Sequence, residues 1–172
     1  MPVSIEPSTN WEKIRQIVAH PSVYRFIADD LSPGPEEWKP MWPEAAIALL
    51  MKDGDEIFGC YILYPENGVC LKVHTCVLPS GYGARASEAG RLGPLWIWEH
   101  TKCQRIITDV PEFNRLALRF AKQSGMTEFG RNPKSYLKDG KLCDVILLGV
   151  SKPDDLLKPA AISSLEQKPL HI

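Results

Sequence analysis

The segment from residue 69 to residue 130 most constrains what this 172-residue chain can fold into. An extended run, 69–78, leads into a glycine-rich turn, 79–85, which reads Pro-Ser-Gly-Tyr-Gly-Ala-Arg and opens a helical pattern. Unpaired N–H groups and the helix dipole at a helix N-terminus favour an anion, and glycine lets phosphate approach the backbone. The pattern therefore predicts a strand, a phosphate-binding turn and a helix in that order.

A second strand and a second helix follow, over residues 105–110 and 112–123. One apolar stripe recurs along this helix with helical spacing and faces away from its basic residues. The stripe comprises Phe113, Leu116, Ala117, Phe120, Ala121 and Ser124. We expect it to pack against a core, with Asn114 at the helix start and Gly125 after its end.

The order of these elements, with Asn114-x-x-Ala117 followed by Gly125-Met126, resembles the GNAT superfamily of N-acetyltransferases. The helix that carries residues 96–101 also resembles small acetyltransferase-like proteins of tailed phages and prophages. The resemblance is clear over residues 69–150. It implies an α/β fold with a central, mostly antiparallel sheet, helices on both faces, and a splayed strand pair that forms the CoA cleft.

The resemblance also implies an activity. The chain would be an acyl-CoA-dependent N-acetyltransferase in which an amine, on a small molecule or a protein, attacks acetyl-CoA directly in a ternary complex. We expect one acyltransferase domain over residues 1–151. A proline-containing tail would follow over residues 152–172.

Cofactor-binding residues carry over from the family positions. Val77 and Leu78 would offer backbone groups to the pantetheine arm at the splayed strand end, and Asn114 would contact the arm or the acceptor side of the thioester. Backbone N–H groups of residues 81–85 would hold the pyrophosphate, with a charge-assisted contact from Arg85. The turn residues concerned are Ser80, Gly81, Tyr82, Gly83, Ala84 and Arg85.

His74 is the candidate catalytic residue because a histidine on the strand that lines the cleft can remove a proton from an amine near neutral pH. A histidine in a strand can equally be a packing residue. Strand register decides between the two, since side chains alternate between faces and a slip of one residue would turn His74 away.

Seven residues after the helix-start asparagine, the family often has a tyrosine that protonates the departing thiolate. This chain has Ala121 there, and Tyr136 and Tyr82 are conceivable substitutes. The alternative is therefore a non-catalytic acetyltransferase-like phage protein that serves as a structural or host-interaction module. A third reading is a protein that holds CoA structurally.

The first 68 residues predict a strand at 3–6, a helix at 11–19 capped by Asn10, a short helix capped by Ser22, and a β-hairpin at 45–64. Between them, the proline-dense segment 32–43 predicts a loop. Its Trp38 and Trp42 either wall an acceptor pocket or anchor the loop.

Composition and charge limit the classes of molecule that this chain is expected to bind. A net charge of −1 and a pI of about 6.4 give no overall footprint for nucleic acid or anionic lipid, and no apolar run is long enough to span a membrane. The five cysteines lack metal-binding spacing, so we expect no metal site and mostly buried, reduced thiols. These features predict a cytoplasmic protein, and a homodimer stays open.

Overall fold

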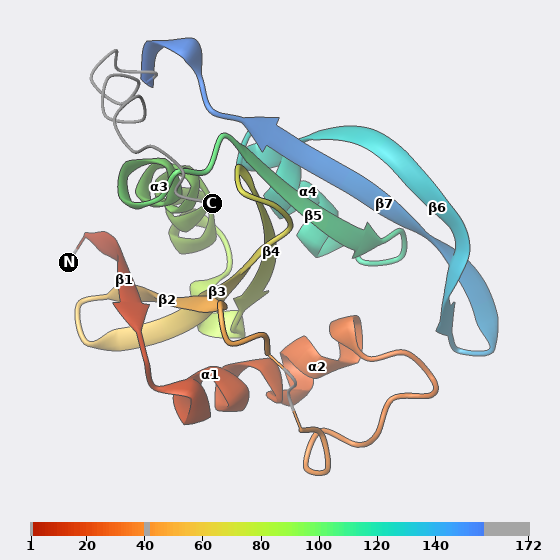
Figure 1. The fold of residues 1–172 in the computed structure, drawn as a ribbon. Coiled ribbons are helices and arrows are strands. Elements are labelled where there is room, and N and C mark those ends of the chain that lie inside the picture. Colours follow the sequence, from red (N-terminus) through yellow and green to blue (C-terminus); the bar gives the residue numbers. More distant parts are fainter. Residues whose placement is uncertain (1, 40–41, 157–172) are drawn as a thin grey trace, which may run out of the picture.

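The computed structural model describes residues 2–39 and 42–156 as one mixed seven-stranded sheet with helices on both faces (Figure 1). The strands are β1 Val3–Ser8, β2 Ile47–Asp53, β3 Glu56–Pro65, β4 Cys70–Val77, β5 Arg105–Pro111, β6 Thr127–Lys138 and β7 Lys141–Ser151. The helices are α1 Trp11–Val18, α2 Pro21–Ile27, α3 Ala84–His100 and α4 Arg115–Gln123, with short 3₁₀ turns at Pro79–Gly81 and Asp154–Leu156.

The strand order in the sheet is β1-β2-β3-β4-β5-β7-β6. Neighbouring strands run antiparallel except β4 and β5, which are parallel and are joined through α3. A parallel pair needs such a crossover because the chain must return from the end of the first strand to the opposite end of the sheet, where the second strand starts. The predicted fold class, mostly antiparallel with one strand-helix-strand crossover, is confirmed.

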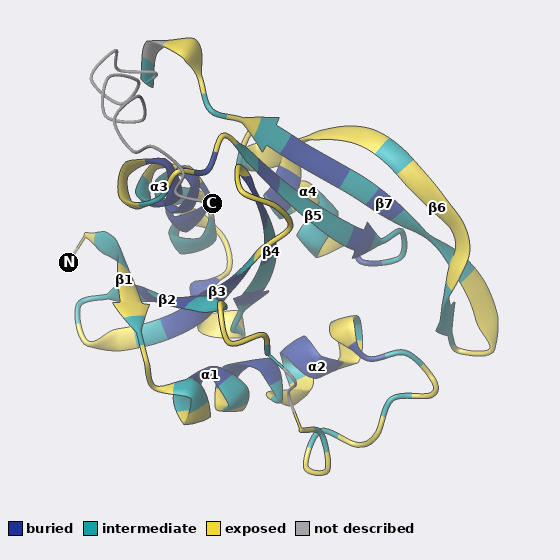
Figure 2. Cartoon of the chain, viewed as in Figure 1, coloured by how far each residue is buried: buried dark blue, intermediate teal, exposed yellow. Residues whose placement is uncertain are grey.

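Two apolar cores cover the two faces of the sheet. One packs α3 and α4 against odd-numbered residues of β4 such as Leu71 and Val73. The other packs α1 and α2 against the opposite face, where it includes Cys76. Figure 2 shows buried residues concentrated on the central strands, while β6 is largely exposed. Four of the five cysteines are buried and all are free thiols, as expected.

Helix α3 runs without a break through Gly93 and Pro94. Its glycines allow close packing. A Cβ at Gly90 would lie 2.5 Å from the Ser124 hydroxyl oxygen, and one at Gly93 would lie 2.7 Å from the Tyr61 ring. These positions lack side chains because α4 and β3 approach the helix too closely for any.

Strand β6 passes through Pro133. The strand tolerates this residue through a bulge: three β6 residues, 133–135, lie opposite Asp144 alone, between the pairs Asn132↔Val145 and Tyr136↔Cys143. A proline lacks the N–H that a ladder requires, and an edge-strand bulge removes that requirement.

Local signals gave the starts of α1 and α4 but not that of α2. The side chains of Asn10 and Asn114 cap α1 and α4 as expected, accepting from the N–H groups of Lys13 and Ala117. Helix α2 instead begins at Pro21, and His20 caps it by accepting from Ser22 N–H, because proline is well suited to the first helical position. Leu116, predicted to face the core, is 49% exposed.

Lys152 still belongs to the fold, since its N–H donates to the Gln104 carbonyl at 2.7 Å. The predicted tail continues beyond the described residues after Leu156, so the boundary at 151 stays a prediction. Among the described residues no helix is long and apolar enough to cross a membrane.

Candidate active site

The parallel strands β4 and β5 separate after three residue pairs. Pairing runs from Cys70↔Arg105 to Lys72↔Ile107 and then ends, although β4 continues to Val77 and β5 to Pro111. The Thr108 hydroxyl donates to the Val73 carbonyl at 2.9 Å, directly past the last pair. A side chain therefore occupies the place of the next ladder bond, and the predicted splay is present.

The splay leaves one edge of β4 with unpaired backbone groups. Leu78 N–H donates to the Phe58 carbonyl at 2.8 Å, and bonding to β3 alternates along an antiparallel pair. Leu78 and Cys76 therefore bond to β3, whereas the N–H and C=O groups of Thr75 and Val77 point toward the gap.

Because of this alternation, only one of the two predicted pantetheine contacts faces the gap. Val77 is placed as expected. Leu78 is not, because its N–H is taken by Phe58 and its carbonyl accepts from Gly81 N–H at 2.8 Å. Thr75, two residues before Val77, instead directs its N–H and C=O groups toward the gap, as the alternation of hydrogen bonds along β4 shows.

A cavity of about 560 Å³ lies at the splay. Its walls come from both sides of the sheet: Ser87, Gly93 and Phe120 belong to the α3/α4 side, and Val18, Tyr24 and Trp42 to the α1/α2 side. Predicted site residues that line it are His74, Val77, Tyr82, Gly83 and Asn114, whereas Leu78, Ser80, Gly81, Ala84 and Arg85 do not. The cavity can thus receive two ligands that meet at the gap between β4 and β5.

The glycine-rich turn presents a helix N-terminus at one end of this cavity. Ser87 N–H donates to the Gly83 carbonyl at 3.0 Å, so the N–H groups of residues 84–86 have no acceptor within α3, and no side chain caps the helix. Gly83 has φ of +85°, a conformation that side chains strain.

Two residues of the predicted phosphate cradle have other tasks. The N–H groups of Gly81 and Tyr82 donate to Leu78 and Pro79 within the 3₁₀ turn, so the available donors begin at residue 83. Gly81 is buried, and a Cβ there would lie 2.4 Å from the Phe58 ring. Gly81 therefore sets the close packing of the turn on β3.

Arg85 points away from the cavity, contrary to the expected phosphate contact. Its Nε lies 2.8 Å from an Asp53 carboxylate oxygen and its Nη1 lies 2.8 Å from one of Glu56. These acids flank the β2–β3 turn, so the guanidinium joins that turn to the start of α3. Two carboxylates compete for the charge, and neither was visible from local sequence.

Replacing Arg85 with alanine is expected to leave the dissociation constant of acetyl-CoA within about twofold, as for other substitutions outside a site. The melting temperature of the Arg85→Ala variant should fall slightly because two ion pairs are lost. Calorimetric titration and thermal unfolding measure the two effects. A loss of affinity of about tenfold or more would show that the guanidinium does reach the phosphates.

Asn114 combines the two roles that its position permits. It is 7% exposed, it lines the cavity, and its Oδ1 accepts from Ala117 N–H at 3.1 Å. Because capping uses Oδ1, the amide nitrogen Nδ2 can still donate to a ligand.

His74 faces the α1/α2 side of the sheet and lines the cavity. It shares this face with Cys76, two residues along β4, and its ring centroid lies 5.0 Å from that of Tyr64. Burial lowers the pKa of His74. The Asp109 carboxylate opposes this shift and Lys72 reinforces it, while these two form an ion pair of 2.7 Å. A largely neutral imidazole at pH 7 can accept a proton.

The loop between α2 and β2 covers the α1/α2 side of the cavity. Trp38 and Trp42 both line the cavity and anchor the loop, with Trp42 4.7 Å from the Trp11 ring and 6.1 Å from the Trp38 ring. The two tryptophans therefore anchor the loop, and their role in an acceptor pocket stays a prediction.

Sequence reasoning missed the contact that fastens this loop. Both carboxylate oxygens of Asp30 accept from the β6–β7 turn, from Asp139 N–H at 2.9 Å and from Gly140 N–H at 2.7 Å. Lys138 Nζ also donates to the Ala28 carbonyl at 2.9 Å. Asp139-Gly140 is a pair typical of a hairpin turn, but nothing local indicates its distant partner.

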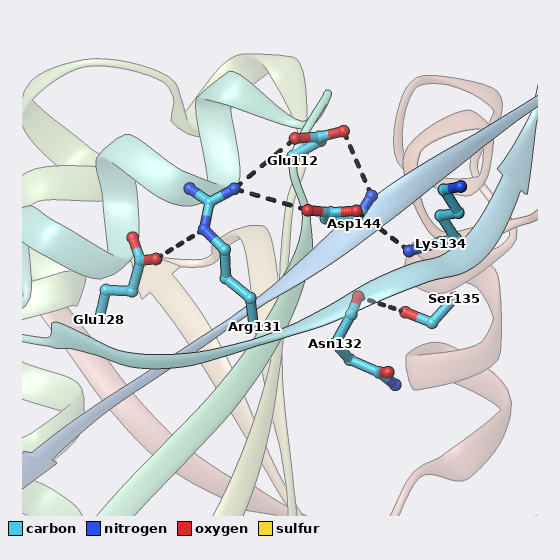
Figure 3. A network of polar contacts seen from close by, with 7 residues as sticks. All are labelled: Glu112, Glu128, Arg131, Asn132, Lys134, Ser135 and Asp144. Carbon is cyan, nitrogen blue, oxygen red and sulfur yellow. Dashed lines mark hydrogen bonds and ion pairs between the residues drawn. The ribbon is translucent and has the colours of Figure 1, made fainter.

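Ala121 is buried and lines the cavity, where it has no proton to donate. The β6 bulge brings Tyr136 to the same cavity. Figure 3 shows the polar network around this bulge: Asp144 accepts from Lys134 N–H at 3.0 Å, and Arg131 contacts Glu112, Glu128 and Asp144. The network ties the bulge to the turn that precedes Asn114.

No protein-family model matches the chain, and no curated protein matches it in sequence. Solved structures do match in fold. A spermidine N-acetyltransferase from Vibrio cholerae, solved with CoA and spermine, superposes with a TM-score of 0.72 at 13% identity, over 91% of this chain and 98% of that one. A GNAT-family acetyltransferase from Streptococcus pneumoniae gives 0.66 at 15% identity, over 88% and 100%. The chain therefore has the fold of GNAT acetyltransferases.

Proposed function

We propose that this protein is an acetyl-CoA-dependent N-acetyltransferase whose amine acceptor attacks the thioester directly in a ternary complex. The observation that carries the proposal is the cavity that passes through the sheet where β4 and β5 separate. One molecule can enter from the α3/α4 side and another from the α1/α2 side. Structural neighbours described as N-acetyltransferases, one of them solved with CoA, support the same activity.

The pantetheine arm would pair with the free edge of β4. The N–H and C=O groups of Thr75 and Val77 point into the splay and can bond an extended amide chain as a further strand would. Asn114 Nδ2 can contact the arm from the opposite wall. The pyrophosphate would bind the N–H groups of residues 83–86 at the start of α3.

In the transfer step, the amine nitrogen forms a bond to the acetyl carbonyl carbon and the carbon–sulfur bond breaks. The electron pair of that bond leaves with the CoA sulfur. A backbone N–H at the free edge of β4 would stabilise the developing oxyanion. His74 would take the proton that the amine nitrogen loses and return it to solvent, and the thiolate would take a proton from solvent, so amide and free thiol are the products.

The non-catalytic module is the alternative that Ala121 favours, since no acid stands where the family often has tyrosine. Such a protein could bind CoA without transferring the acetyl group. The phage resemblance likewise remains a prediction. Binding and transfer must therefore be measured separately.

Acetyl-CoA is expected to bind with a dissociation constant from about micromolar to sub-millimolar and to raise the melting temperature. Replacing Gly83 with valine should weaken binding by about tenfold or more, because a β-branched residue strains φ of +85° and thereby displaces the first phosphate donors. Calorimetric titration checks both results. Gly140→Val is the matched control, since Gly140 also has positive φ, of +70°, but does not line the cavity.

Absence of heat and of thermal stabilisation at millimolar acetyl-CoA would contradict the proposal. Binding without thiol release, tested across many amines, would favour the non-catalytic module. Unchanged affinity in Gly83→Val would show that the phosphate contacts lie elsewhere.

A further inference from the structure

The half of the cavity on the α1/α2 side, here called the acceptor pocket, has an aromatic wall. Six aromatic residues contribute to it: Tyr24, Phe26, Trp38, Trp42, Tyr64 and Tyr136. Three of these rings support one another, since Tyr24 lies 6.0 Å from Trp38 and Trp38 lies 6.1 Å from Trp42, both edge-on. Such a wall is held in place before a ligand binds and offers it apolar surface.

The pocket carries little negative charge. Among the described residues that line the cavity, Asp109 is the one carboxylate, and it already pairs with Lys72 at 2.7 Å. Asp29 and Asp30 lie near Tyr136, but neither lines the cavity. Asp29 accepts from Leu31 N–H and the Ser32 hydroxyl, and Asp30 accepts from two N–H groups of the β6–β7 turn. A ligand with several ammonium groups would have to bury charges without partners, which is costly.

The pocket is also limited in size. The α2–β2 loop joins the β6–β7 turn through Asp30 and Lys138 on the outer side. The volume of about 560 Å³ must hold the acyl end of the cofactor as well as the acceptor. A small molecule fits these limits better than a polypeptide segment.

One polar group on the wall lacks a partner. The Tyr136 hydroxyl is buried and has no hydrogen-bond partner among the described residues, while its ring packs 5.7 Å from that of Phe113. Burial, with the nearby Asp29 and Asp30, raises the pKa of Tyr136 to about 12, so the hydroxyl keeps its proton at neutral pH. A buried donor of this kind selects a ligand that offers an acceptor.

We infer that the acceptor is a small monoamine with an aromatic body and one polar substituent, and that this substituent accepts a hydrogen bond from Tyr136. The inference rests on the proposed acetyl transfer. Tyr136 determines specificity for the polar substituent of the amine, and the aromatic wall determines specificity for its aromatic body.

The test compares amines at saturating acetyl-CoA by release of free thiol. Tyramine and 2-phenylethylamine represent aromatic monoamines with and without the polar substituent, spermidine represents polyamines, and a lysine peptide represents polypeptides. We expect kcat/KM for tyramine to exceed that for spermidine and the peptide by about tenfold or more. The kcat/KM for tyramine should exceed the kcat/KM for 2-phenylethylamine by about two- to tenfold, which corresponds to the net contribution of one neutral hydrogen bond.

Tyr136→Phe should bring the tyramine to 2-phenylethylamine ratio close to one while leaving the melting temperature unchanged or higher, since the lost hydroxyl has no protein partner. Tyr24→Phe is the matched control. Its hydroxyl donates to the Pro33 carbonyl at 2.6 Å, so this variant should lose stability but keep the ratio.

Preference for spermidine or the peptide would overturn the inference, as would an unchanged ratio in Tyr136→Phe or turnover of none of the aromatic amines by protein that binds acetyl-CoA. Failure to bind acetyl-CoA in a parallel titration would instead contradict the proposed function. The two failures are therefore distinguishable.

Discussion

Replacing His74 with alanine is expected to lower kcat by about 10²- to 10⁴-fold and to leave acetyl-CoA affinity nearly unchanged. The imidazole lies on the α1/α2 face of β4, whereas the proposed cofactor contacts come from the strand edge and from α3. A base on that face would act on the amine and not on the cofactor. Thiol-release kinetics and calorimetric titration of the same variant measure the two quantities.

The pH dependence follows from the direction of the His74 pKa shift. Burial lowers this pKa, so the ring loses its proton at a lower pH than an exposed histidine, whose pKa is about 6.5. The ascending limb of kcat/KM for the parent should therefore lie below about pH 6.5 and be absent in His74→Ala.

Stability should respond in the same pH range. Below about pH 6.5 the unfolded chain takes up a proton at His74 more readily than the folded one, so the free energy of unfolding falls as the pH decreases. Urea unfolding at several pH values should show a shallower decline in His74→Ala, because that variant lacks the group.

His100→Ala is the matched control for these measurements. His100 is exposed at the end of α3, its Nδ1 lies 2.9 Å from the Trp96 carbonyl oxygen, and it does not line the cavity. It should keep the activity and the pH profile of the parent. Activity of His74→Ala within about threefold of the parent, with an unaltered profile, would exclude the base role, because general-base catalysis contributes far more.

Replacing Phe58 with alanine is expected to cost about 3–5 kcal/mol of unfolding free energy. Phe58 is 0% exposed in the core between the sheet and the α3/α4 side, and its ring lies against Gly81. Removing the ring leaves a cavity that the turn above it can fill only by moving. Urea unfolding of parent and variant measures the cost.

Phe58→Leu separates the two consequences of that change. Leucine refills most of the volume, so it should cost less than alanine while still leaving the glycine-rich turn poorly supported. Leu142→Ala provides the exposed control, since that side chain is 61% exposed and should lose little. A cost below about 1 kcal/mol for Phe58→Ala would mean that the site collapses around the missing ring.

The amino-acid sequence determined the features that arise within a few residues. Asn10 and Asn114 cap their helices because a short polar side chain reaches N–H groups of the next turn, which no distant residue need assist. The glycine-rich turn likewise indicated that a strand ends before it and a helix begins after it. With the framing of α4 by Asn114 and Gly125, these local signals were enough to indicate the fold and the position of the site.

Only the tertiary structure decided how the site residues are used. Arg85 is adjacent to the helix N-terminus in sequence, but Asp53 and Glu56 on a distant hairpin hold its charge. Thr75 rather than Leu78 faces the splay, because bonding to β3 fixes which backbone groups point there. A polar group forms hydrogen bonds and ion pairs with the partners that lie near it in space. Spacing along the chain does not show which partners those are.

The acceptor pocket depends most on such distant contacts. Tyr136, the first paired residue after the bulge opposite Asp144, lines the cavity, and Asp30 fastens the covering loop to a turn more than a hundred residues away. His74 could be named from the sequence as a base, but its face followed from the register of β4 between two cores. Local propensity sets the elements, whereas packing sets the direction of each side chain, and chemistry depends on direction.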